Sequence, residues 1–183
     1  GYSKIYQQVP QLLKFFQNYL PGGENAKLRE IAPILGVRES RRIMGDYILT
    51  AEDMIEGKVF DDAVAMGGYH IDIHRPKGTW VDSTNVKAYT IPLRSLIAKD
   101  VDGLMMAGKC ISATHEAIAG TRVIPICIAQ GEAAGTAAAM AVKADTTLRE
   151  INIPALQEQL VRQGAEIGRT VGPPNQEIID KLG

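Results

Sequence analysis

The spacing of apolar residues predicts helices towards both ends of the chain and extended segments between them. Over residues 4–20 apolar side chains recur every three or four positions, which is the period of an amphipathic helix. A Pro-Gly-Gly sequence at 21–23 ends that helix. Residues 28–49 have the pattern of an extended segment, in which Gly36 and Gly45 mark tight turns or close backbone approaches.

Two short helices are predicted next. Thr50 and Asp53 have the spacing of a capping box, in which Thr50 is the helix N-cap. Asp61 or Asp62 caps another short helix that runs through Met66 and ends at two glycines.

Three short strands are predicted in the middle of the chain. In residues 69–76, YHIDIHRP, the alternation places the isoleucines on one face and His70, Asp72 and His74 on the other. A loop over 75–88 carries Trp80. The sequence AYTIPLRSLI after it indicates a strand, in which Pro92 favours an edge position or a bend. Leu104–Ala107 has the pattern of a strand buried on both faces.

The last part of the chain is predicted to be helical. A helix of mostly alanine and glycine begins at Pro125, since proline is favoured in the first turn. An amphipathic helix follows over Ile153–Gln163, and the tail from Gly168 onward is predicted to be loosely held.

Composition excludes some classes of function. The 183 residues carry a net charge of -1, which gives no sign of a nucleic-acid groove or of a basic membrane surface. The longest apolar stretch is interrupted by Gln130 and Glu132, so no membrane span is expected. Cys110 and Cys127 are interpreted as buried reduced thiols, and a cytoplasmic location is favoured although no signal assigns a compartment.

The stretch from Leu104 to Lys143 has features of a ligand-binding wall. The predicted strand ends at Ala107-Gly108, where a ligand can approach the backbone, and ligands of open α/β sheets bind beyond such strand ends. The predicted loop after it leads through Gly120-Thr121-Arg122 into the alanine-rich helix, whose N-terminus suits a carbonyl or a developing anion. Tight packing of a helix with small side chains against a sheet explains the same pattern without any ligand.

The sequence VDGLMMAGKCISATHEAIAGTRVIPICIAQGEAAGTAAAMAVK strongly resembles the C-terminal FAD-closing segment of FAD-dependent oxidoreductases, the group that includes fumarate reductase and ketosteroid dehydrogenase flavoproteins. It is most similar to a bacterial subgroup of uncertain substrate. The upstream GVRESRRIMGDYILTAEDM and YHIDIHRPKG, and the later YTIPLRSLI, resemble that subgroup too, so the resemblance covers about residues 28–165.

The resemblance implies an FAD site with particular contacts. Ala107 and Gly108 would approach the ribityl chain or pyrophosphate, while Lys109 stands where many relatives carry a glutamate. Arg122 matches a position that stabilises substrate charge in some relatives, and His115 in the preceding predicted loop is a candidate acid or base. Further cofactor contacts are expected from Gly120, Thr121, Pro125, Ile126, Cys127 and Ile128.

The resemblance also implies the fold class and the division of the chain. We expect a mixed α/β chain in which residues 1–100 are β-rich substrate-domain material and residues 101–183 complete a Rossmann-like FAD-binding domain. The GxGxxG turn that holds the ADP half of FAD is not found in this sequence. The chain is therefore expected to be a fragment or a subunit that needs an N-terminal half or a partner chain, and homo-oligomerisation is left open. A non-catalytic assembly module derived from a flavoprotein is the alternative.

Two polar clusters are further candidates. Arg38 and Arg42 share a face by alternation and are candidates for substrate binding, with Glu39 and Arg41 on the opposite face and Arg94 a weaker candidate. A surface ion-pair network is the alternative for this cluster. His70 and His74 either line the substrate pocket, form with Asp72 a metal site, or belong to a solvated strand face. No metal ion is predicted.

Overall fold

The computed structural model describes residues 2–74 and 81–168. The predicted loop with Trp80 falls partly outside the described residues, and so does the predicted tail with Pro173-Pro174, of which only Gly168 is described. The chain divides into two compact units, Gly1–Val37 and Arg38–Gly183. The predicted division at residue 100 into substrate and FAD portions stays a prediction.

The first unit contains one long helix and an extended return segment. Helix α1 (Tyr2–Tyr19) confirms the predicted helix, but none of its residues is buried. The helix is held to its own return segment by hydrogen bonds, because the Leu35 backbone N–H donates to the Tyr2 hydroxyl at 2.8 Å and Gln17 Nε2 donates to the carbonyl of Ala26. The apolar face of α1 therefore contributes no core within this unit.

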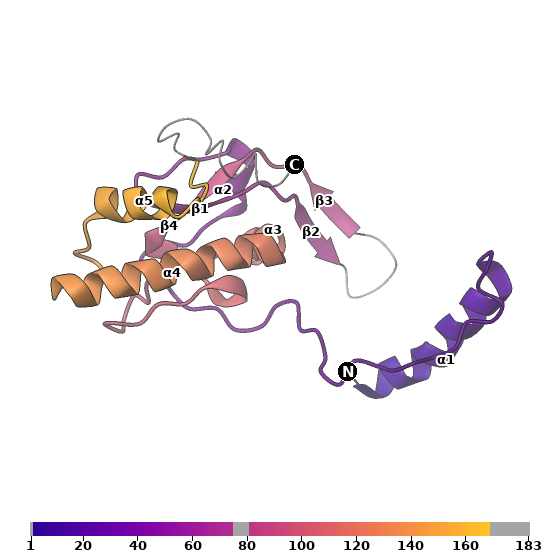
Figure 1. The fold of residues 1–183 in the computed structure, drawn as a ribbon. Coiled ribbons are helices and arrows are strands. Elements are labelled where there is room, and N and C mark those ends of the chain that lie inside the picture. Colours follow the sequence, from indigo (N-terminus) through magenta and orange to yellow (C-terminus); the bar gives the residue numbers. More distant parts are fainter. Residues whose placement is uncertain (1, 75–80, 169–183) are drawn as a thin grey trace. The chain divides into compact units, whose positions relative to one another are not determined.

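The second unit combines helices with two small antiparallel sheets (Figure 1). One sheet pairs β1 (Ala63–Gly67) with β4 (Tyr89–Pro92), and the other pairs β2 (Ile71–His74) with β3 (Val81–Thr84). The helices are α2 (Ala51–Glu56), α3 (His115–Thr121), α4 (Ile124–Ala144) and α5 (Ile153–Arg162), with 3-10 turns η1 (Leu93–Ser95) and η2 (Gly108–Cys110). This mixture confirms the α/β class, whereas its Rossmann-like character stays a prediction.

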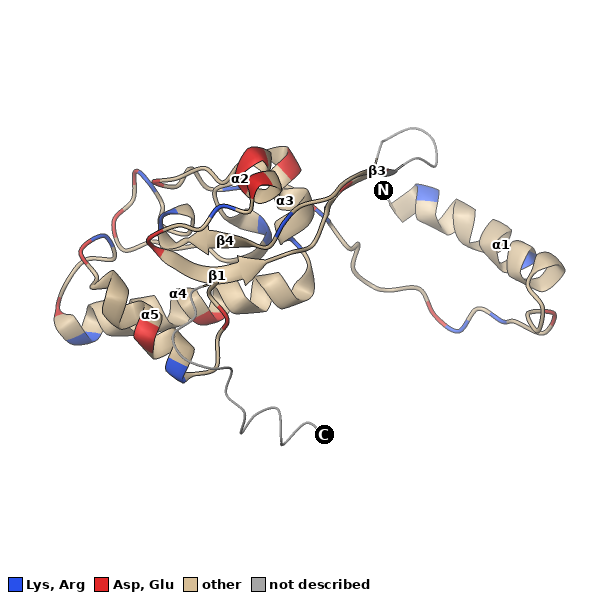
Figure 2. Ribbon diagram, turned by 90° about the horizontal axis from the view of Figure 1, so that it is seen from above, with Lys and Arg blue, Asp and Glu red and all other residues tan. Residues whose placement is uncertain are grey.

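The helices cover the strands in a fixed arrangement. Helices α4 and α5 pack on β1, α2 packs on β4, and α3 packs on β2. Helix α2, with acidic residues in its first turn, lies near α3 in the view of Figure 2. Because α3 contacts both β2 and η2, it connects the second sheet to the start of α4.

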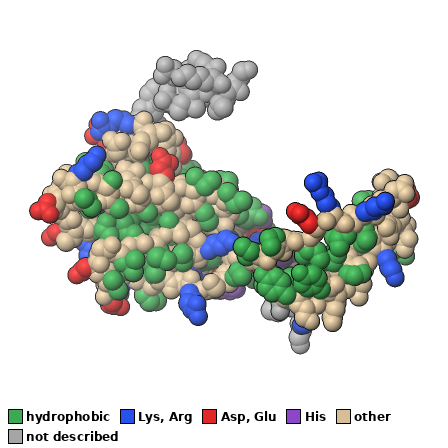
Figure 3. Space-filling model, turned by 60° about the horizontal axis from the view of Figure 1, so that its bottom comes forward, with side chains coloured by type: hydrophobic (Ala, Val, Ile, Leu, Met, Phe, Trp, Pro, Cys, Tyr) green, Lys and Arg blue, Asp and Glu red, His purple; other side chains and the backbone are tan. Residues whose placement is uncertain are grey.

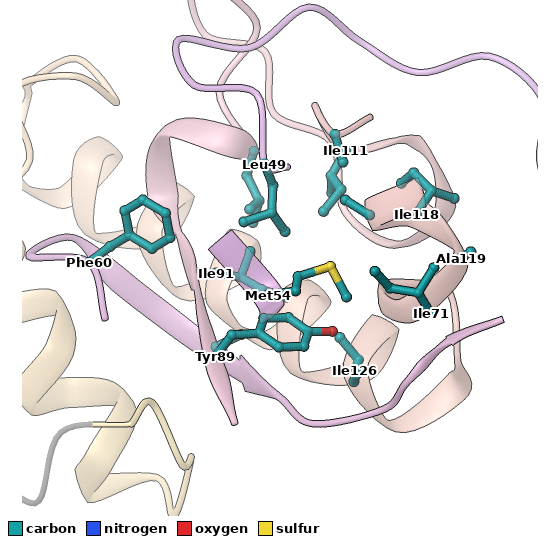
Figure 4. Packing of buried hydrophobic residues seen from close by; sticks show 14 residues of the cluster. Leu49, Met54, Phe60, Ile71, Tyr89, Ile91, Ile111, Ile118, Ala119 and Ile126 are labelled. Carbon is teal, nitrogen blue, oxygen red and sulfur yellow. The ribbon is translucent and has the colours of Figure 1, made fainter. Parts of the chain in front are cut away.

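A core of apolar side chains lies between α2, α3 and the strands (Figure 4). Met54, Tyr89 and Ile118 are almost fully buried in it. Gly67 has no side chain because a Cβ there would lie 2.6 Å from the Tyr89 ring. A second apolar cluster joins α4 and α5 through Ala133, Ala137, Leu156 and Leu160.

Several predicted elements are confirmed. Helix α2 starts with the predicted capping box, in which Thr50 Oγ1 accepts from the Asp53 N–H and Asp53 accepts from the Thr50 N–H. Helix α4 begins one residue before Pro125, and α5 spans the predicted final helix to within one residue. Cys110 and Cys127 are free thiols, as expected, although both are only partly buried.

The prediction of a helix from Asp61 or Asp62 through Met66 is wrong. These residues lead into β1, and Ala63, Val64 and Ala65 are buried beside β4. The Asp62 carboxylate accepts from the Arg94 backbone and guanidinium, so it ties two strand ends together instead of capping a helix.

The predicted strand at Leu104–Ala107 and the loop after it also differ from the structure. Gly103, with φ +70, turns the chain back on itself, and only a single bridge joins Met105 to Ile97. Residues 115–121 of the predicted loop form α3, which is capped by Thr114 and meets α4 at a bend of 95°. Among the described residues no single helix is long and apolar enough to cross a membrane, and only this bent pair reaches that threshold together.

Candidate functional site

A cavity of about 300 Å³ in the second unit gathers residues from three parts of the sequence. Two residues of the irregular segment before β1, strand β2, and helix α3 with the residue after it supply its walls. The cavity is lined by Arg38, Glu39, Ile73, His74, His115 and Arg122. Four of these were predicted to be substrate-binding or catalytic from the sequence, and the fold brings them together.

Arg122 is the buried cation of this cavity. It lies at the break between α3 and α4, and its side chain is 8% exposed. Its Nη2 donates to the Asp72 carbonyl at 2.7 Å, whereas Nε has no hydrogen-bond partner among the described residues. A buried N–H donor without an acceptor is costly, so an acceptor brought by a ligand would be favoured here.

Glu39 is the carboxylate at the centre of the cavity wall, and the sequence analysis did not assign it a functional role. Its Oε1 contacts Arg42 Nη1 and lies 2.8 Å from His115 Nδ1, and its Oε2 lies 3.7 Å from Arg122 Nη1. The predicted alternation, with Arg42 facing away from Glu39, is therefore wrong. Residues 38–42 form no regular strand, and the irregular backbone lets Arg42 fold back towards Glu39.

Asp72 is a second, buried carboxylate that contacts residues of the cavity without lining it. Its Oδ2 lies 3.4 Å from Arg38 Nη2, and its Oδ1 lies 3.1 Å from His74 Nε2. The contact with His74 lacks hydrogen-bond geometry, so Oδ1 has no hydrogen-bond partner among the described residues. The cavity therefore presents two histidines, two arginines and the Glu39 carboxylate, while Asp72 lies beneath Arg38 and His74 as their partner.

Two predicted substrate residues do not line this cavity. His70 stacks on Tyr69 with ring centroids 4.2 Å apart, just before β2 begins. Arg42 forms an ion pair with Glu39 instead. The metal site considered for His70, Asp72 and His74 is not formed, since the described residues contain no group of three side chains suited to a metal ion.

The predicted flavin-contacting turn lies against helix α4. Gly108 has φ +79 and its N–H donates to Gln130 Oε1 at 2.6 Å. Gln130 is completely buried, and its Nε2 has no hydrogen-bond partner among the described residues. The sequence analysis did not predict Gln130 as a site residue. Helical spacing could have indicated it, because Gln130 is a polar residue on the same helix face as Ala133 and Ala137.

The start of α4 is exposed and has no capping side chain. Val123 occupies the N-cap position without a side-chain hydrogen bond, and Pro125 lies in the first turn. Ile124 and Ile128 are 75% and 65% exposed. The first turn of a long helix carries partial positive charge, so this end of α4 favours a carbonyl or an anion.

The other predicted cofactor residues surround the same junction. Ala107 and Lys109 flank Gly108, while Gly120 and Thr121 are buried in the last turn of α3. Burial raises the pKa of the Cys127 thiol despite the nearby Lys109. A raised pKa disfavours the reactive thiolate, so Cys127 is not prepared for nucleophilic or redox chemistry.

A larger cavity of about 510 Å³ lies on another side of the unit and is less suited to bind an anion. Its rim includes Arg94 and Arg149. Arg94 pairs with Asp62 at 2.9 Å, and Arg149 pairs with Asp46 at 2.8 Å. Both cations are thus already engaged by aspartates, and the weaker prediction of a ligand contact for Arg94 gains no support.

A comparison with protein families, rather than the geometry of these sites, gives the class of protein, the flavin-dependent oxidoreductases. The model of the family described as FAD dependent oxidoreductase matches residues 3–160, so the chain belongs to this family. Comparisons with curated proteins and with solved structures find no match.

The residues present fit one side of a flavin site. Gly108 leaves space, since a Cβ there would come no closer than 3.8 Å to its nearest neighbour, Cys127 Sγ. The buried and unpartnered Gln130 Nε2 lies on the helix beside it. Together with the uncapped start of α4, this junction offers N–H donors to a polar, planar ligand, which agrees with the chemistry of the isoalloxazine edge.

Proposed function

We propose that this chain completes the flavin site of an FAD-dependent oxidoreductase that acts on a small molecule with an anionic group. Bound FAD would supply the hydride chemistry at its isoalloxazine ring. The residues of the chain would bind and orient the substrate, stabilise charge and take up a proton.

The observation that carries the proposal is the buried guanidinium of Arg122. Its Nε lacks a partner among the described residues, and the cavity that it lines adjoins the first turn of α4. A carboxylate or similar group of the substrate would satisfy this donor, and Arg38 would add a second cation at the cavity edge. The substrate would thereby be held beside the flavin edge that α4 contacts.

The start of α4 would serve the cofactor. Reduction of a flavin places negative charge on the pyrimidine side of the ring, and the backbone from Pro125 to Ile128 would face that charge. The Ala107-Gly108 turn, fixed by Gln130, would approach the ribityl chain or the pyrophosphate. Lys109 would then stand near the anionic part of the cofactor, where many relatives carry a glutamate.

We propose further that an N-terminal FAD-binding half, upstream or on a partner chain, covers the outer face of α4. Ile124, Ile128 and Val142 lie on one stripe of this helix and are 75%, 65% and 82% exposed. Gly131 and Gly135 on the same stripe have no neighbour within 4 Å of a built Cβ. Figure 3 shows hydrophobic side chains spread over a face of the larger unit, with acidic side chains along its edge.

The first test is a visible absorption spectrum of the purified chain mixed with excess FAD and passed through gel filtration. A perturbed flavin band that stays with the protein would show that the site is substantially complete in this chain. If no flavin is retained, the same measurement is made on the protein with its upstream coding sequence included. A longer protein that also stays colourless would contradict the proposal and favour the assembly-module alternative.

A matched pair of variants would locate the flavin. Ile128→Glu adds an acidic side chain at the start of α4 without disturbing the core, because Ile128 is exposed. We expect it to weaken FAD binding at least about tenfold, the effect of roughly 1.4 kcal/mol of repulsion. Lys143→Glu places the same side chain in the exposed last turn of α4 and should leave FAD affinity unchanged. Equal effects of both changes would show that FAD does not contact the start of the helix.

A further inference from the structure

The contact between Glu39 and His115 has a geometry that assigns a proton to one ring nitrogen. Glu39 Oε1 lies 2.8 Å from Nδ1 of His115. An ionised carboxylate can only accept hydrogen bonds, so a neutral His115 ring must carry its proton on Nδ1 to use this contact. Its Nε2 then has a free lone pair and can accept a proton.

The surroundings of Glu39 favour this role. Its side chain is 17% exposed and is contacted by Arg42 and Arg122, both of which stabilise the ionised carboxylate. The His115 side chain, in contrast, is 56% exposed and lines the cavity. The carboxylate is thus fixed by ion pairs with two arginines, while the imidazole is accessible to a substrate.

We propose that Glu39 is a positioning residue that fixes His115 with Nδ1 protonated, so that Nε2 is the proton acceptor of the cavity. The chemical step rests on the proposed function. A substrate with an O–H or N–H next to the carbon that is oxidised would lose the C–H bonding pair as hydride to FAD. The O–H or N–H proton would pass to His115 Nε2, and the carbon would form a double bond to its oxygen or nitrogen.

Other charged groups face the same imidazole and enter the test. Glu116 is the next residue on α3. Its carboxylate accepts a hydrogen bond from its own backbone N–H, and this bond lowers the pKa of Glu116, although burial opposes the change. The charge of His115 makes a smaller contribution in the same direction. Arg42 and Arg122 contact Glu39, and His74 of β2 is another lining residue of the cavity. Only Glu39 makes a direct hydrogen bond to the His115 ring among the contacts of the described residues.

Nuclear magnetic resonance of the ring nitrogens tests the proposal directly on this chain, without FAD or substrate. The sequence has only three histidines, so long-range proton–nitrogen correlations of a ¹⁵N-labelled sample can be assigned one by one. The spectrum is recorded at about pH 8.5, about two pH units above the pKa of a free histidine side chain. We expect His115 to show a protonated Nδ1 and an unprotonated Nε2, the reverse of the form that free neutral histidine side chains favour.

Two variants separate positioning from general charge effects. Glu39→Leu should reverse the pattern so that Nε2 of His115 becomes the protonated nitrogen, with unchanged signals of His70 as the sign of an intact fold. Glu116→Gln removes a neighbouring negative charge but leaves the Glu39 contact, and should keep the protonated Nδ1. An unprotonated Nδ1 in the unaltered chain would overturn the proposal even if the Glu39 variant did not fold.

The proposed function and this inference fail in different measurements. If the nitrogen pattern is as expected but no form of the protein retains FAD, the proposed function fails and the positioning contact stands. If FAD is retained but Glu39→Leu leaves the protonated Nδ1 of His115 unchanged, the inference fails and the flavin site stands.

Discussion

The carboxylate of Asp53 connects the first turn of α2 to two neighbouring side chains, and its removal should measurably destabilise the second unit. It accepts from the Thr50 N–H at 3.1 Å, from the Tyr47 hydroxyl at 2.8 Å, and from Lys58 Nζ at 2.8 Å. The aspartate is 6% exposed, so in Asp53→Ala water would not fully replace the hydrogen bonds that the carboxylate accepts. We expect the variant to fold but to unfold more easily.

The expected loss follows from the contacts. A helix N-terminal capping interaction contributes about 1 kcal/mol, and a hydrogen bond from the partly buried Tyr47 hydroxyl to a charged acceptor contributes about 1.5 kcal/mol. The free energy of unfolding should therefore fall by about 2.5 kcal/mol, without counting the exposed Lys58. For a chain of 183 residues this lowers Tm by about 7 °C.

Thermal and urea unfolding followed by circular dichroism would measure this loss. Glu52→Ala, an exposed change in the same helical turn, is the matched control and should stay within about 0.5 kcal/mol of the unaltered chain. A loss below about 1 kcal/mol for Asp53→Ala would refute the calculated contribution of the cap and the hydroxyl bond.

The same carboxylate predicts a dependence of stability on pH. Burial by itself would raise the pKa of Asp53, but hydrogen bonds from Lys58, Tyr47 and the Thr50 N–H outweigh burial and hold the pKa below its usual range. A lowered pKa in the folded state stabilises the protein above the unfolded pKa of about 4, and this contribution is lost as pH falls through the folded value. Asp53→Ala should therefore lose less stability than the unaltered chain when urea unfolding is compared at about pH 6 and about pH 3.

Four further substitutions test packing and hydrogen bonds in the second unit. Gly45→Ala should lower the free energy of unfolding in urea by about 1–3 kcal/mol, because a Cβ there would lie 2.7 Å from a side-chain carbon and 2.9 Å from a carbonyl oxygen. Gly135→Ala, with open space around it, should instead stabilise α4 by about 0.5–1 kcal/mol. Equal effects of the two substitutions would contradict the packing. Gln130→Leu removes the acceptor of the Gly108 N–H, and amide hydrogen exchange at Gly108 should accelerate about tenfold; an unchanged rate would show that the turn is fixed by other contacts. Tyr89→Phe removes a buried hydroxyl that donates to a carbonyl of α3, and it should lower the free energy of unfolding by about 1 kcal/mol. An unchanged free energy of unfolding would show that this hydrogen bond does not stabilise the fold.

The reasons for success and failure of the sequence predictions differ between elements. The cap of α2 and the start of α4 depend on side chains within one turn, so Thr50 with Asp53 and Pro125 were sufficient to predict them. Residues 61–66 were predicted to be a helix because an aspartate before an apolar run is a common helix N-cap. In the structure the same aspartate accepts hydrogen bonds next to a strand. Only Arg94, distant in sequence, decided that Asp62 ties two strands together.

The candidate site shows the same division. The resemblance singled out Arg122 and His115, and the charge pattern singled out Arg38 and His74, and the fold places all four around one cavity. Glu39 was placed on the wrong face because strict alternation was assumed for a segment that is not a strand. Its contacts with Arg42 and His115 join residues that are neighbours only in the folded chain.

The sequence by itself determined the local helix signals, the mixed α/β class and the resemblance to flavoproteins, because each depends on the order of neighbouring residues. The tertiary structure alone decided that α3 exists as a separate helix bent by 95° from α4. It also decided that Gln130 reaches Gly108 and that Glu39 reaches His115. These contacts depend on how β2, α3 and α4 pack on one another, and packing of distant segments leaves no periodic pattern in a single sequence.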